Sequence, residues 1–147
     1  MAKIDIRRLG PGDVSVLDRV AADVFDGPVQ KKRLAVFLRE TNHMMFVAVC
    51  EGEVVGQARG MIHLHPDKED ELYIDNLGVA PAFQKQGVGT RLMKVLLQAG
   101  RDHGCSEAWV GTETDNAAAR KLYESLGEAG EPCVFFTYKI SKIPPGT

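Results

Sequence analysis

The chain has 147 residues, a length that suits a single domain over residues 1–147 whose core needs no disulfide or metal. Its net charge of −2 and its 44% of hydrophobic residues give no global signal for a nucleic-acid or anionic-membrane partner. Three cysteines without CxxC spacing, a charged N-terminal segment and the absence of an apolar run of about 18 residues favour a cytoplasmic protein with reduced thiols.

Hydrophobic periodicity predicts the elements of the first half of the chain. Asp13 is placed as the N-cap of a first amphipathic helix, and Pro28 opens a second one. Two β-prone runs on either side of a turn at Glu51-Gly52-Glu53 are typical of a hairpin. The expected elements are a strand at 4–9, helices at 13–24 and 28–38, and strands at 44–50 and 54–62.

The second half of the chain places a glycine-rich turn between a strand and a helix. A polar, acidic loop at 63–70 leads into a strand in which acidic or aromatic residues alternate with apolar ones. After the glycine turn, the periodicity returns to the helical spacing. The expected elements are a strand at 71–79, a helix at 88–103, a strand at 106–112, a helix at 116–126 and a strand at 134–140.

The glycine turn, residues 84–90, has the features of a phosphate-binding loop. The first turn of a helix presents unpaired N–H groups and the positive end of the helix dipole, and Gly87 and Gly89 carry no Cβ that would block a phosphate. A P-loop is excluded because no Lys-Ser or Lys-Thr follows the glycines, and Leu92 stands where a dinucleotide fingerprint needs a third glycine. An ordinary turn into a helix remains the alternative.

Two sequence blocks resemble the motifs of the GNAT acetyltransferase superfamily. The first is Leu77-Gly78-Val79-Ala80-Pro81 followed by Gln84-Lys85-Gln86-Gly87-Val88-Gly89-Thr90, and the second is the stretch Asn116 to Gly127, with Leu122-Tyr123 before its final glycine. The resemblance implies an α/β (α+β) GNAT fold. Its central sheet is mixed but mostly antiparallel, has six to seven strands, is splayed between strands 4 and 5, and is flanked by about four helices.

The resemblance also implies acetyl-CoA as co-substrate, without a metal. Tyr123 is assigned as the general acid that protonates the leaving thiolate, with packing in a helix stripe as the alternative. Asn116 is assigned to hydrogen-bond the arm of acetyl-CoA, with a role as the helix N-cap as the alternative. The full set assigned to acetyl-CoA is Leu77, Gly78, Val79, Gln84, Lys85, Gln86, Gly87, Val88, Gly89, Thr90, Asn116 and Tyr123.

An acceptor amine must lose its proton before it attacks, so the site needs a general base. Strand alternation puts Glu71, Tyr73 and Asp75 on one face, and Asp75 and Glu71 are the candidates. A strand bulge would bring Asn76 round to that face instead. Two solvated carboxylates without a catalytic role are the alternative.

The acidic run that leads into this strand suits a polycationic acceptor. The segment from Glu71 to Val79 is most similar to the aminoglycoside 3-N-acetyltransferases of the GNAT type, although it departs from them at Asp75-Asn76. Acetylation of a protein N-terminus, a lysine or another small amine, and a non-catalytic acetyl-CoA-binding module, are the alternatives. The residues assigned to the acceptor are Asp67, Glu69, Asp70, Asp75 and Asn76.

Three further features carry weaker signals. His63 and His65 have the i, i+2 spacing of a metal pair, but the sequence identifies no third ligand, and a surface loop is the favoured reading, with a role for His65 toward the acceptor as another. Trp109 is interpreted as a packing residue. The apolar run 133–138 suits a homodimer that pairs through C-terminal strands, as in many GNAT enzymes, or else an ordinary buried strand.

Overall fold

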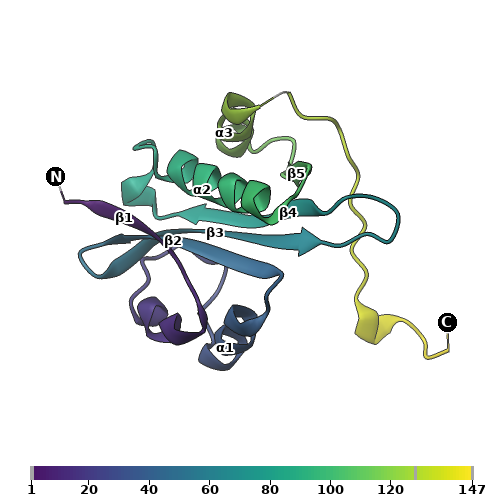
Figure 1. Cartoon of the computed structure of the whole chain (residues 1–147), viewed down its shortest axis with the longest axis horizontal. Helices are drawn as coiled ribbons and strands as arrows, with labels where there is room; N and C mark the ends of the chain where they lie inside the picture. The colour runs from purple at the N-terminus through teal and green to yellow at the C-terminus, as the bar shows by residue number, and fades with distance from the viewer. Residues whose placement is uncertain (1, 128, 147) are drawn as a thin grey trace. The chain divides into compact units, whose positions relative to one another are not determined.

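The computed structural model describes residues 2–127 and 129–146 (Figure 1). The chain forms two compact units, one up to residue 111 and one from residue 112 onward. The first unit contains one sheet with helices on both faces. Its elements are β1 (Ile4–Arg8), η1 (Pro11–Asp18), α1 (Lys31–Arg39), β2 (His43–Cys50), β3 (Glu53–His63), β4 (Glu71–Val79), η2 (Pro81–Phe83), α2 (Val88–His103) and β5 (Glu107–Val110).

The sheet has the order β1-β2-β3-β4-β5, so neighbours in sequence are neighbours in space. The first four strands are antiparallel, and β5 joins β4 in parallel after the crossover through α2. The mixed, mostly antiparallel sheet is as expected. The expected count of six to seven strands is wrong, because the described residues form five.

Helix α2 covers one face of the sheet, and η1 and α1 cover the other (Figure 1). The apolar stripe of α2 is buried, with Leu92 and Leu96 fully inaccessible to solvent. Close packing requires glycine on β3, because a Cβ at Gly60 would lie 2.9 Å from side-chain atoms of both Leu72 and Leu96. The helix therefore packs closely on β3 and β4.

The first predicted helix, 13–24, is wrong in type and length. Residues 11–18 form a 3-10 helix, and the chain then runs beside the start of β3 as a parallel bridge between Val20 and Val54. Asp13 is not the N-cap. Gly10 occupies that position, and Asp13, the third residue of the helix, accepts a hydrogen bond from the Gly10 N–H at 2.7 Å. Backbone pairing with the sheet edge thus overrides the helical periodicity.

The second unit contains α3 (Ala117–Leu126) and the short 3-10 helix η3 (Ile140–Lys142). The strand expected at 134–140 is wrong, because residues 134–139 have no regular structure and their large apolar side chains are exposed. A strand needs a partner edge for its backbone groups, and the described part of this unit contains only helices. No helix within residues 2–127 and 129–146 is long and apolar enough to cross a membrane.

Candidate active site

The glycine loop adopts a conformation that leaves the start of α2 open. Gly87 is the N-cap of α2 in the left-handed conformation, with φ of +81°, which favours glycine at this position. A Cβ built on Gly87 would meet no atom within 4 Å, so the space above it is free. The N–H groups of the first turn of a 16-residue helix face this opening without intrahelical partners. The start of α2 therefore forms a cradle that an anionic group can enter.

Side chains of the loop fix its shape. The Gln84 amide donates to the Val79 carbonyl at 3.0 Å, and the Gln86 amide donates to the Ala82 carbonyl at 3.0 Å. Arg91 donates to the Ile4 carbonyl at 3.1 Å, which ties the first turn of α2 to β1. Lys85 adopts a φ of +60° with an exposed side chain. These bonds use side-chain donors and leave the backbone N–H groups at the helix start for a ligand.

The β4–β5 ladder ends before β4 does. Pairing runs from Glu71↔Glu107 to Ile74↔Val110, whereas β4 continues to Val79. In the described ranges, residues 75–79 of β4 have no strand partner on this side. An open edge of this kind can hydrogen-bond an extended ligand arm, and it leads directly into the glycine loop. Leu77, Gly78 and Val79, assigned to the pantetheine arm, all lie on it.

A β-bulge lies at the point where the ladder ends. Arg59 pairs with Asn76 and Gly60 pairs with Ile74, so Asp75 has no partner on β3. The bulge reverses the alternation of side chains, and Asn76 faces the same side of the sheet as Gln57. Asp75 is exposed at the bulge. The structure thus contains the bulge that the sequence analysis considered as an alternative to regular alternation.

A buried polar network anchors this face. The Gln57 amide donates to the Asn76 side-chain oxygen at 2.6 Å and to the Val24 carbonyl at 3.2 Å. The Gln57 side-chain oxygen and the Arg59 Nε are buried without a hydrogen-bond partner within the described residues. Gly78 is in close contact with the same segment, because a Cβ there would lie 2.1 Å from the Val24 oxygen. This face therefore contains buried polar atoms whose hydrogen-bonding capacity is not used within the described residues.

A hollow of about 380 Å³ lies in the segment between η1 and α1. Its lining includes Phe25 and the carboxylates Asp18 and Asp23, and the Arg59 guanidinium lies 5.8 Å from the centre of the Phe25 ring. Asp23 is exposed and has a φ of +66°, an uncommon conformation for a residue other than glycine. The hollow is open to solvent, and Lys31 pairs with Asp18 at 3.4 Å, so its negative charge comes mainly from Asp23.

Two carboxylates of the acidic run are engaged by side chains of the chain itself. Asp70 pairs with His103 at 3.3 Å, and Glu71 pairs with His65 at 2.5 Å and with Lys68 at 3.3 Å. The Lys68 ammonium first, and then His65, hold the pKa of the Glu71 carboxyl below its usual range. Asp67 and Glu69 remain exposed.

The structure separates the two candidate bases. Glu71 begins β4, inside the stretch that pairs with β5, and four residues at about 3.3 Å each put Asp75 roughly 13 Å further along. Glu71 is engaged with His65 and Lys68, whereas Asp75 lies exposed where the ladder ends. Trp109 packs on Tyr73 across the strands, with ring centroids 4.3 Å apart.

In the second unit, Asn116 and Tyr123 lie on α3. The Asn116 side chain accepts a hydrogen bond from the Ala119 N–H at 3.1 Å, so it is the N-cap of the helix. Tyr123 is half-buried, and burial raises the pKa of its phenol above the usual value. The phenol therefore keeps its proton at neutral pH, as a general acid must before the reaction.

Residues 16–127 match the model of the acetyltransferase (GNAT) family, about three-quarters of the chain. This chain belongs to the GNAT acetyltransferase family. The two sequence blocks that resemble GNAT motifs correspond in the structure to the end of β4 with the glycine loop, and to α3.

Known proteins similar to this GNAT chain fall into two groups. Human N-alpha-acetyltransferase 30 is 30% identical over 102 residues, which cover 69% of this chain but 28% of that protein. The [ribosomal protein bS18]-alanine N-acetyltransferase of Escherichia coli K12 is 40% identical over 58 residues, or 40% of this chain and 39% of that protein. The chain thus spans less than half the length of these relatives.

Among solved structures, the aminoglycoside acetyltransferase meta-AAC0020 from a soil metagenomic sample, in complex with trehalose, has a TM-score of 0.82 at 25% identity. The similarity covers 93% of this chain and 96% of that one. The aminoglycoside N-acetyltransferase AAC(6')-Iy in complex with CoA has a TM-score of 0.75 at 20% identity and covers 95% of this chain and 97% of that one, which supports the fold alone.

Sequence reasoning missed Asp23, Gln57 and Arg59. The two β3 residues carried a signal, because polar side chains at alternating positions of an otherwise apolar strand are unusual in a sheet buried on both faces. Asp23 carried none, since its position depends on the irregular segment after η1. Sequence reasoning also found no third partner for His63 and His65, although the structure places Glu71 beside them.

Proposed function

We propose that the chain transfers the acetyl group of acetyl-CoA to a primary amine of a polycationic small molecule. Aminoglycosides are the first candidate class, with their 3-amino group as the acceptor that the sequence resemblance favours. The observation that carries the proposal is the β4 edge. It is open from Asp75 to Val79 and leads straight into the glycine loop at the start of α2.

The proposal divides the cofactor between two elements. The backbone N–H groups of the loop and of the first turn of α2, within residues 84–90, hold the pyrophosphate. The open edge from Leu77 to Val79 pairs with the pantetheine arm, and Asn116 also contacts that arm. When bound, acetyl-CoA supplies an activated thioester, so the protein needs only to position the amine and move two protons.

Asp75 takes a proton from the acceptor ammonium, directly or through water. The amine nitrogen then forms a bond to the thioester carbonyl carbon, and the carbon–sulfur bond breaks. Tyr123 gives its proton to the departing thiolate. The raised pKa of Tyr123 supports this assignment, and the exposed position of Asp75 at the bulge supports its role as base. Glu71 is the second candidate base. Its carboxylate is already paired with Lys68 and His65, so it is less available than Asp75 to accept a proton.

The acceptor class is supported by charge, and the similar structure meta-AAC0020 is an aminoglycoside acetyltransferase. Four carboxylates of the first unit are exposed: Asp67 and Glu69 in the loop before β4, Asp75 at the bulge where the open edge begins, and Asp23 in the hollow between η1 and α1. Carboxylates of this kind attract a polycation and partly offset its desolvation. Asp70 contributes less because His103 pairs with it.

A protein N-terminus is the second candidate acceptor. The sequence relatives that are protein N-alpha-acetyltransferases, at 30% to 40% identity, favour it. The two candidates differ in what the site must offer, since a peptide needs backbone partners along a groove and a small polycation needs carboxylates.

A thiol-release assay tests the proposal. The enzyme is given acetyl-CoA together with one acceptor at a time from a panel of aminoglycosides, polyamines and short peptides. We expect turnover with aminoglycosides, and NMR of the product should place the acetyl group on the 3-amine. Turnover with peptides alone would contradict the aminoglycoside proposal and make a protein N-terminus or lysine the acceptor. Tight acetyl-CoA binding without turnover on any amine would favour a non-catalytic module.

We also propose a homodimer through the C-terminal apolar segment, residues 133–138. Four large side chains of this segment are 66% to 78% exposed: Val134, Phe135, Phe136 and Tyr138. Exposing this much apolar surface to water is unfavourable for an isolated chain. Their β-prone sequence suits pairing with the same segment of a second copy.

A further inference from the structure

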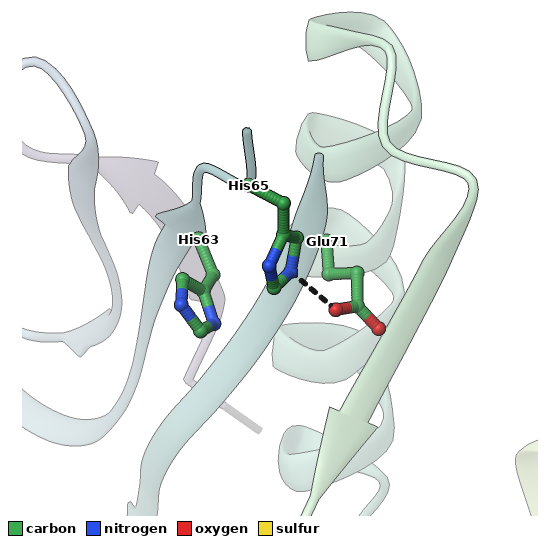
Figure 2. Close-up of side chains that lie close together, drawn as sticks. All are labelled: His63, His65 and Glu71. Carbon is green, nitrogen blue, oxygen red and sulfur yellow. Dashed lines mark hydrogen bonds and ion pairs between the residues drawn. The ribbon is translucent and has the colours of Figure 1, made fainter. Parts of the chain in front are cut away.

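The hairpin between β3 and β4 brings three metal-binding side chains together at its closed end. His63 is the last residue of β3, Glu71 is the first residue of β4, and the two are direct partners across the strands. His65, in the connection between them, turns back toward the pair (Figure 2). One ligand atom from each of the three residues lies within 4.8 Å of the others.

The contacts within this trio account for His65 but not for His63. His65 Nε2 lies 2.5 Å from Glu71 Oε1, a strong charge-assisted hydrogen bond. The His63 imidazole makes no hydrogen bond in the described part of the chain, and its ring lies against that of His65 with centroids 4.2 Å apart. His63 is nevertheless exposed, so water would compete for it. A ligand bound by both imidazoles would account for the close approach of the two rings.

The side chains of His65 and Glu71, and the backbone of His63, are ordered before any ligand arrives. The side chains of His65 and Glu71 are 14% and 17% exposed, and the sheet register fixes the backbone of His63 and Glu71. A site that is already ordered loses little conformational entropy on binding. This distinguishes the trio from freely rotating surface histidines.

We propose that His63, His65 and Glu71 form a binding site for a zinc-type divalent cation. Two imidazoles and one carboxylate are a donor set that zinc accepts, with water in the fourth position. Bonds of about 2.0–2.2 Å in tetrahedral geometry place ligand atoms roughly 3.3 Å apart. Zinc would therefore open the His65–Glu71 contact from 2.5 Å and draw in donor atoms that are now up to 4.8 Å apart, which are rotamer adjustments.

Lys68 competes with the metal for the same carboxylate. Its ammonium lies 3.3 Å from Glu71 Oε1, and its side chain is 57% exposed, so it can move into solvent when a cation arrives. Replacing Lys68 by a neutral residue removes this competitor. The Lys68→Ala variant should therefore bind zinc more tightly than the wild type, which a hairpin without a metal site has no reason to do.

The site lies apart from the open β4 edge and the glycine loop that are proposed to hold acetyl-CoA, and it takes up Glu71, the second candidate base. It lies at the closed end of the β3–β4 hairpin, in the stretch where β4 pairs with β5 and before the edge opens. Zinc bound there would clasp the two strands and engage Glu71 as a ligand. The expected consequence is stabilisation of the folded state by mass action.

The test uses the full, tag-free chain after removal of metals, titrated with ZnCl₂ in a calorimeter and followed by its Tm. We expect one zinc per chain and a rise in Tm. His63→Ala should lower the affinity by more than about 100-fold, beyond the 10- to 100-fold that loss of an outer partner costs. Because His63 is exposed, the metal-free variant should keep the wild-type circular dichroism and Tm.

His103→Ala is the matched control, because His103 also pairs with a carboxylate, Asp70, but has no third ligand beside it in the described residues. It should bind zinc like the wild type. CaCl₂, which prefers six or more oxygen ligands, should give no heat and no change in Tm. Wild-type protein without zinc binding, or equal binding by His63→Ala, would overturn the proposal, as would weaker binding by Lys68→Ala.

Discussion

At the scale of single residues, the proton on Tyr123 is central to the proposed chemistry. Burial raises the pKa of its phenol, so the protonated form persists at neutral pH and is lost only as the pH rises through that elevated pKa. Tyr123→Phe removes the proton donor and keeps the ring. We expect kcat to fall by about 10²- to 10⁴-fold, with little change in the KM for acetyl-CoA.

The pH profile separates this role from packing. Wild-type kcat should decline on the alkaline side as the phenol loses its proton, and the Phe variant should lack that decline. An unchanged kcat in Tyr123→Phe would remove Tyr123 from the chemistry and leave it as a packing residue.

Asp75 and Asp67 are both exposed carboxylates of the acidic region, and only Asp75 lies at the bulge. Asp75→Asn keeps the shape of the side chain and removes its basicity. Steady-state kinetics at neutral pH should show a fall in kcat of about 10²-fold or more, because the acceptor ammonium keeps its proton. Asp67→Asn is the control, and should raise the KM of a polycationic acceptor without lowering kcat. Equal kcat in the two variants would exclude Asp75 as the base.

At the scale of elements, the start and the end of α2 provide a matched pair of glycines. Gly87 and Gly104 both adopt positive φ, +81° and +106°, and at neither would a Cβ meet an atom within 4 Å. Alanine at either position should cost about 1–2 kcal/mol of unfolding free energy. Only Gly87→Ala places a methyl group in the phosphate cradle.

Calorimetry with CoA and the two alanine variants gives the comparison. Gly87→Ala should weaken CoA binding by at least about 10-fold, roughly 1.4 kcal/mol, whereas Gly104→Ala should leave it unchanged. The same affinity for CoA in both variants would mean that the loop does not hold the pyrophosphate.

Gly78 fixes the segment around Val24 against β4. A Cβ at this position would lie 2.1 Å from the Val24 carbonyl oxygen, and backbone cannot move aside as a side chain can. Gly78→Ala should therefore lower the unfolding free energy by about 3 kcal/mol or more in urea denaturation. Gly12→Ala, where a Cβ meets nothing, should change it by less than about 0.5 kcal/mol. Similar losses in both variants would contradict this packing.

The elements that the sequence predicted well are those whose local pattern and tertiary setting agree. β4 at 71–79 and α2 at 88–103 match their predicted bounds, because alternation and a buried helical stripe each point to one structure. The helix expected at 13–24 failed where Ala21 and Val54 pair through their backbones. The turn into α2 at Gly87 was predictable from the local glycines, and its role toward the cofactor stays a prediction. Gln57 and Arg59 stood out as polar positions of an apolar strand, but their contacts with Val24 and Phe25 were not predictable, because those two residues lie in the irregular segment between η1 and α1.

At the scale of the whole molecule, the C-terminal apolar segment bears on the oligomeric state. If residues 133–138 pair between copies, light scattering should give twice the mass of one chain. Phe136→Asp puts a charge into that interface and should yield monomers. Val36→Asp, which changes an exposed apolar residue of α1, should leave the mass unchanged. A monomeric wild type would rule out the dimer.

The central claim is acetyl transfer from acetyl-CoA to an amine of a small polycation. One competition measures it most directly: the enzyme receives limiting acetyl-CoA with an aminoglycoside and an N-terminal peptide at equal concentration, and mass spectrometry follows both products. We predict that the acetyl group appears on the aminoglycoside, in a reaction that Gly87→Ala slows and Gly104→Ala does not. Acetylation of the peptide alone, or of neither acceptor while CoA binds, would contradict the claim.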